Sequence, residues 1–101
     1  MEGIVIVLKV VNVTVHESPL GAGPICGVTF KKRNGHEVIR WFSINYPYPF
    51  FDLLHAARCR VPKNYMVNTQ TLIGRRVGAV VTMRDYRGTR YAWVGQFERL
   101  P

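Results

Sequence analysis

The last third of the chain carries the clearest alternation of apolar and polar positions. Two β-branched runs, 77–83 and 91–97, flank a turn-like Asp-Tyr-Arg-Gly segment at 85–88. Period-two alternation around a glycine-containing loop predicts a β-hairpin. One side of the first run is apolar, comprising Val77, Ala79, Val81 and Met83. The other side is largely polar or small, with Val80 as the apolar exception, and comprises Arg76, Gly78, Thr82 and Arg84. In the second run, Ala92 and Val94 lie opposite Tyr91 and Trp93.

The first half of the chain predicts three further strands. The run from Gly3 to Val15 is apolar on both parities, which favours a long bent strand shared within a small barrel. Ile25 to Lys32 is a second strand, and Asn34-Gly35 predicts a hairpin into a third strand, Glu37 to Ile44. Adjacent strand residues face opposite ways, so we expect one of Trp41 and Phe42 to be buried and the other exposed. Burial of both around a bulge is the alternative.

A single short helix is predicted after the proline-rich segment 45–49. Apolar residues recur at helical spacing up to Cys59, and Pro49 suits a position just ahead of the helix. We expect this apolar stripe to plug the core and His55 to lie on the surface. The stripe comprises Phe50, Leu53, Leu54 and Ala57. Segment 19–24 is predicted to be a loop, and segment 61–72 a loop with a short extended piece.

The predicted element order is three strands, one helix and two strands in a single domain spanning residues 1–101. A mainly β, five-stranded antiparallel barrel with one short helix between the third and fourth strands is the oligonucleotide-binding (OB) topology. An α+β sandwich, with the helix laid across an open sheet, is the alternative.

Composition and charge narrow the function. The 101 residues are 48% apolar and 12% aromatic, which is typical of a folded domain, and the formal net charge is +8 with a pI near 10.1. So large a positive charge on a small domain favours an anionic partner, with nucleic acid ahead of an acidic protein or lipid headgroups.

Catalysis, metal binding and membrane insertion find little support in the sequence. The six acids are scattered, and the three histidines lie about 20 positions apart. Cys59 and His55 have i, i+4 spacing, but a short helix in a barrel rarely presents a nucleophile. Cys26 and Cys59 form neither a disulfide framework nor a zinc pattern. The apolar N-terminal run is too short to span a membrane and lacks a basic leader. We expect a cytoplasmic protein without enzymatic activity, cofactor or metal.

Basic and aromatic residues interleave in the segments that would form an OB binding face. Cations neutralise phosphates, and exposed aromatic rings stack on bases. The candidate phosphate contacts are Lys31, Lys32, Arg33, Arg40, Arg76, Arg84, Arg87 and Arg90. The candidate stacking residues are Trp41, Tyr86, Tyr91 and Trp93.

The chain also resembles the small single-stranded DNA-binding proteins of bacteriophages, including those encoded beside phage recombination genes. The similar stretches are HESPLGAG (16–23), GVTFKKRNGHEVIRWFSI (27–44) and GRRVGAVVTMRDYRGTRYAWVGQF (74–97). A spaced pattern in the last stretch carries the similarity: Gly74, Arg75, Gly78, Tyr86, Gly88, Tyr91, Val94 and Phe97. The resemblance implies an OB fold, single-strand binding with little sequence preference in replication or recombination, and dimers or higher oligomers. The sequence ends at Glu98-Arg99-Leu100-Pro101 without the acidic tail by which many such proteins recruit partners.

Two other interpretations fit the same residues. One is a protein-interaction module, for example a phage inhibitor that docks its basic face on a host defence complex. The other is a single-stranded RNA binder, which would exploit the 2′-hydroxyl. Spacing and composition do not separate these interpretations from DNA binding.

Overall fold

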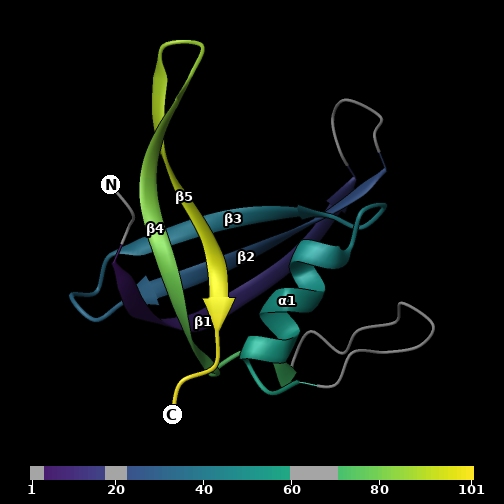
Figure 1. Cartoon of the computed structure of the whole chain (residues 1–101). Helices are drawn as coiled ribbons and strands as arrows, with labels where there is room; N and C mark the ends of the chain where they lie inside the picture. Colours follow the sequence, from purple (N-terminus) through teal and green to yellow (C-terminus); the bar gives the residue numbers. More distant parts are fainter. Residues whose placement is uncertain (1–3, 18–22, 60–70) are drawn as a thin grey trace.

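A computed structural model describes residues 4–17, 23–59 and 71–101 (Figure 1). Five strands and one helix make up this part of the chain: β1 (Val5–Glu17), β2 (Pro24–Lys32), β3 (Glu37–Ser43), α1 (Tyr48–Ala56), β4 (Arg76–Tyr86) and β5 (Thr89–Glu98). All five predicted strands and the predicted helix are confirmed, with shifted ends. Most of the predicted loop at 19–24 and nearly all of that at 61–72 lie outside the described residues.

The strands form one antiparallel sheet in the order β3-β2-β1-β4-β5. The predicted strand number, antiparallel pairing and helix position are confirmed. The sheet is not closed into a barrel, because β3 and β5 remain its two edge strands. The far end of the β4–β5 hairpin projects beyond the other strands (Figure 1).

Two bulges bend the sheet. In β1 the register with β2 shifts between Val10 and Asn12, so Val11 is an extra residue in a long strand that pairs with both β2 and β4. The predicted long strand that pairs on both sides is confirmed, whereas its place in a small barrel is not, because β1 is the middle strand of one open sheet. The register between β4 and β5 shifts between the pairs Gly78–Glu98 and Val80–Gly95, so β5 has one extra residue there. Gln96, within this bulge, has a φ of 51°. The second bulge turns Phe97 onto the core, where its ring lies 5.7 Å from Phe30.

A two-residue loop, Arg87-Gly88, connects β4 and β5. Arg87 and Gly88 both have positive φ, at 51° and 78°, as a type I′ turn requires. The predicted turn at 85–88 was therefore two residues too long, since Asp85 and Tyr86 still pair across the strands. The predicted hairpin at Asn34-Gly35 is confirmed.

Helix α1 packs its predicted stripe into the core. Phe50, Leu53, Leu54 and Ala57 are all buried, which confirms the interpretation of the helix as a core plug. The helix ends earlier than predicted, at Ala56. Arg58 then adopts a φ of 60°, and the Cys59 amide donates to the carbonyl of Leu54. Cys59 therefore does not share a helix face with His55.

The side of β3 that carries Phe42 faces the core, and the side that carries Trp41 faces outward. Phe42 is 3% exposed and its ring lies 5.4 Å from that of Phe50, whereas Trp41 is 51% exposed. The register between β2 and β3 runs without a shift, so simple alternation holds and the alternative with a bulge is wrong.

At nine residues α1 falls well short of a bilayer's thickness, and no other described segment forms a helix that would cross one.

Candidate nucleic-acid interface

One face of the β4–β5 hairpin combines aromatic rings with a cation. Direct cross-strand partners lie on the same side of a sheet. The pairs Thr82–Trp93, Arg84–Tyr91 and Tyr86–Thr89 therefore share one side. We define the hairpin face by its four large side chains: Arg84, Tyr86, Tyr91 and Trp93. Tyr86 and Tyr91 are 63% and 42% exposed, so their rings are open to a ligand.

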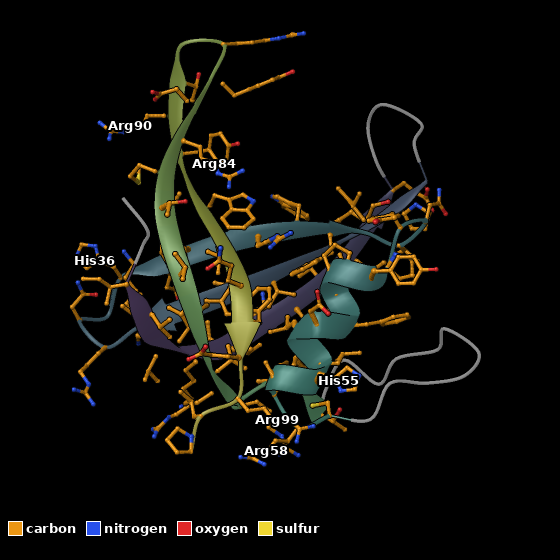
Figure 2. The ribbon with its side chains drawn as sticks, in the orientation of Figure 1. His36, His55, Arg58, Arg84, Arg90 and Arg99 are labelled. Atoms are coloured by element: carbon orange, nitrogen blue, oxygen red, sulfur yellow. The ribbon has the colours of Figure 1, made fainter. Side chains whose placement is uncertain are left out.

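Trp93 lies between two arginines. The guanidinium carbon of Arg84 (Figure 2) is 4.0 Å from the centre of the Trp93 indole. The guanidinium carbon of Arg40 is 5.0 Å from the same point. A Cβ added at Gly95 would come within 2.0 Å of the same indole, so glycine there leaves room for the ring. These contacts hold a half-buried aromatic ring between β5 and β3.

Arg40 links the two edge strands. Its Nη1 atom donates a hydrogen bond to the carbonyl oxygen of Val94, and its guanidinium lies 4.8 Å from the centre of the Phe42 ring. Burial lowers the pKa of Arg40, as does the nearby charge of Arg84, and Asp52 opposes both effects. The cation is therefore incompletely compensated, which favours an incoming anion.

A cleft of about 450 Å³ opens beside Trp93, between α1 and β5. Arg40, Asp52 and His55 line it together with Trp93 and Phe97. His55 is exposed on the helix, as predicted (Figure 2). The cleft leaves part of the indole accessible from the helix side.

The hairpin tip adds a second open hollow, of about 570 Å³, lined by Tyr86, Arg87, Thr89 and Tyr91. The guanidinium of Arg87 lies 5.3 Å from the centre of the Tyr86 ring. Arg90 points the other way, because it pairs with Asp85 on the opposite side of the hairpin. The structure thus brings Arg87 to the hairpin face and separates Arg90 from it.

Four other predicted phosphate contacts gather elsewhere. Lys31, Lys32, Arg33 and Arg76 line a separate cleft of about 350 Å³ with Val7 and Lys9. The sequence interpretation missed Lys9, although a lone lysine in the apolar run 4–15 was a signal for it.

Trp41 lies apart from the hairpin face. Its ring covers Gly27 on β2 and lies 5.9 Å from the ring of His16 on β1. The structure therefore does not bring this predicted stacking residue together with Tyr86, Tyr91 and Trp93.

No model of a known protein family matches the sequence, and no curated protein matches it either. Within the described residues, no three histidine, cysteine, aspartate or glutamate side chains are grouped to hold a metal ion. The geometry of the cations and aromatic rings carries the functional argument below.

Proposed function

We propose that this protein binds single-stranded DNA with little sequence preference, stacking bases on the hairpin face and neutralising phosphates with the adjoining arginines. The observation that carries the proposal is the hairpin face itself. Three aromatic rings and Arg84 lie on one side of two paired strands, and Tyr86 and Tyr91 are well exposed. Every base has a flat face, so stacking of this kind is tolerant of sequence.

The strand order supports an OB-like architecture for this function. An OB fold is a five-stranded, partly open barrel whose helix follows the third strand. Here β3 and β5 are the sheet edges that would meet in such a barrel, and the Arg40 hydrogen bond to Val94 spans them. We assign the function to replication or recombination of the phage type on the resemblance described above.

The proposal is tested by fluorescence anisotropy with a labelled dT16 oligonucleotide, a duplex and a single-stranded RNA of equal length, at low and moderate salt. We expect micromolar or tighter binding to dT16 that weakens with salt, and poor binding to the duplex. Tighter binding to the RNA than to dT16 would make the protein an RNA binder that uses the 2′-hydroxyl. Absence of binding at low salt would reject a nucleic-acid function.

A protein-interaction module is the second candidate, and one observation favours it. Ile39 and Trp41 are both 51% exposed and lie two residues apart on the same side of the edge strand β3. Exposed apolar side chains on an unpaired edge suit a protein partner. Trp41→Ser combined with Ile39→Ser distinguishes the two functions, because it removes this patch and leaves the hairpin face intact. Unchanged dT16 affinity in this variant is expected for DNA binding at the hairpin.

A further inference from the structure

A row of cations crosses three neighbouring strands away from the hairpin tip. Lys9 on β1 pairs directly with Lys31 on β2 and with Arg76 on β4. Neighbouring strands lie about 4.8 Å apart, so the three residues occupy one line across the sheet. Together with Val7, Lys32 and Arg33 they line the cleft of about 350 Å³ described above, which we call the basic cleft.

The row opposes the stability of the sheet. Like charges placed directly opposite each other in an antiparallel pair repel, and Lys9 faces one on each side. No acid is among the described residues that line the cleft, although Glu37 on β3 is the direct cross-strand partner of Lys31 and the Glu98 side chain lies over Gly78. A bound polyanion would relieve the repulsion, and its negative charge complements the five cations.

The chemistry of the basic cleft selects phosphate over base. None of the described residues that line it is aromatic, so this part of the cleft offers no surface on which a base could stack. Lysine ammonium groups bind phosphate as point charges, and arginine adds paired donors. The cleft therefore suits a chain of phosphates, whereas the hairpin face suits bases.

A single strand can reach both sites. Arg76 and Arg84 lie an even number of positions apart on β4, so their side chains start from the same side of the strand. The eight positions between them correspond to about 26 Å at roughly 3.3 Å per residue. We infer that the basic cleft is a second, base-independent site that holds the sugar–phosphate backbone of the same single strand as it leaves the hairpin face. The choice of a nucleic-acid strand as occupant rests on the proposed function, whereas the preference for a phosphate chain rests on the cleft alone.

The test compares dT16 with an abasic 16-mer, which has the same phosphates but no bases. The cleft variant is K9Q/K31Q, and the matched control is R58Q/R90Q, which also removes two charges, one near the helix end and one on the side of the hairpin opposite the hairpin face (Figure 2). Tyr91→Ala removes one aromatic ring from the hairpin face and therefore tests base stacking there. Circular dichroism confirms folding of each variant, and K9Q/K31Q is expected to fold because it relieves repulsion.

We expect K9Q/K31Q to weaken binding of both the abasic 16-mer and dT16 at least tenfold. R58Q/R90Q should change either affinity less than threefold, and Tyr91→Ala should weaken only dT16. Abasic binding that K9Q/K31Q leaves unchanged would overturn the inference. Equal displacement of the abasic 16-mer by polyglutamate would also overturn it, because the cleft would then accept an acidic protein. If dT16 binds no better than the abasic 16-mer and Tyr91→Ala has no effect, base stacking fails while the basic cleft stands.

Discussion

At position 95, the absence of a side chain decides where Trp93 lies. A Cβ there would come within 2.0 Å of the indole, closer than any real contact, so the ring has to move. We expect Gly95→Ala to weaken dT16 binding about fivefold or more, since stacking on one aromatic ring is worth roughly 1–3 kcal/mol. Anisotropy titration measures the loss, and acrylamide quenching of tryptophan fluorescence in a Trp41→Phe background, where Trp93 is the remaining tryptophan, reports the displaced ring.

Gly27→Ala is the matched control for this prediction. A Cβ at Gly27 would come within 2.6 Å of the Trp41 ring, so the substitution displaces the protein's other tryptophan in the same way. Because Trp41 lies apart from the hairpin face, dT16 affinity should change less than twofold. Equal losses in the two variants would show that general strain in the sheet, and not the position of Trp93, reduces binding.

Cys26 gives a residue-level prediction about stability. The thiol is 3% exposed, and burial raises its pKa above the ordinary value. Above about pH 8.5 the unfolded chain ionises its cysteine while the folded protein keeps the proton. The folded state then binds more protons than the unfolded state, so the free energy of unfolding falls as pH rises. Below about pH 8.5 this contribution to stability is fully present.

Urea denaturation at pH 7.5 and pH 10, in reducing buffer, measures the effect. Other groups titrate in the same range, so the informative quantity is the difference between the natural protein and Cys26→Ala. We expect the natural protein to lose more stability between the two pH values than Cys26→Ala does. An identical loss in both would mean that the Cys26 thiol is accessible to water in the folded state.

At the scale of elements, we expect the two sides of the hairpin to contribute differently to single-strand binding. Arg84 lies on the hairpin face beside Trp93, whereas Arg90 lies on the other side, opposite Asp85. Arg84→Gln and Arg90→Gln each remove one charge from the same hairpin. Charges more than about 8 Å from a phosphate are largely screened at physiological salt, so the side of the hairpin matters. We expect Arg84→Gln to weaken dT16 binding about tenfold and Arg90→Gln less than threefold.

Anisotropy at 0.15 M salt checks this prediction, and a repeat at low salt should narrow the difference between the two variants. If both substitutions weaken binding equally at 0.15 M salt, the hairpin attracts nucleic acid by its total charge and the hairpin face has no special role.

The sequence predicted those features that depend on neighbouring residues. Alternation in 77–83 and 91–97 separates Trp93 from Val94, and the structure buries Val94 and leaves Trp93 half-buried, outside the core cluster. The bulge at Gln96 was not predictable from alternation, which puts Phe97 on the side of Trp93. The grouping of Lys9 with Lys31 and Arg76 depends on the register between distant strands, which no local pattern contains.

At the scale of the whole molecule, the chain has a net charge of +8, and the structure gathers eight of its cations into two separate groups. Arg40, Arg84 and Arg87 adjoin the aromatic rings, and five more cations line the basic cleft. Each phosphate neutralised on a single strand contributes about −0.7 to the slope of log Kobs against log salt concentration. A strand on the hairpin face alone would therefore give a slope near −2, whereas a strand that also enters the cleft would give a slope of about −5.6.

Strand length separates these two cases. Four nucleotides span about 14 Å at a stacked rise of about 3.4 Å, too short for the roughly 26 Å between Arg76 and Arg84. We expect a slope near −2 for dT4 and of about −5.6 for dT16, and K9Q/K31Q should flatten only the dT16 slope, by about 1.4. Equal slopes for the two lengths would confine the strand to one site. Anisotropy over 50–300 mM salt provides the measurement. The dT16 slope of K9Q/K31Q should be flatter because two fewer phosphates are neutralised, so fewer counterions are released from the strand on binding.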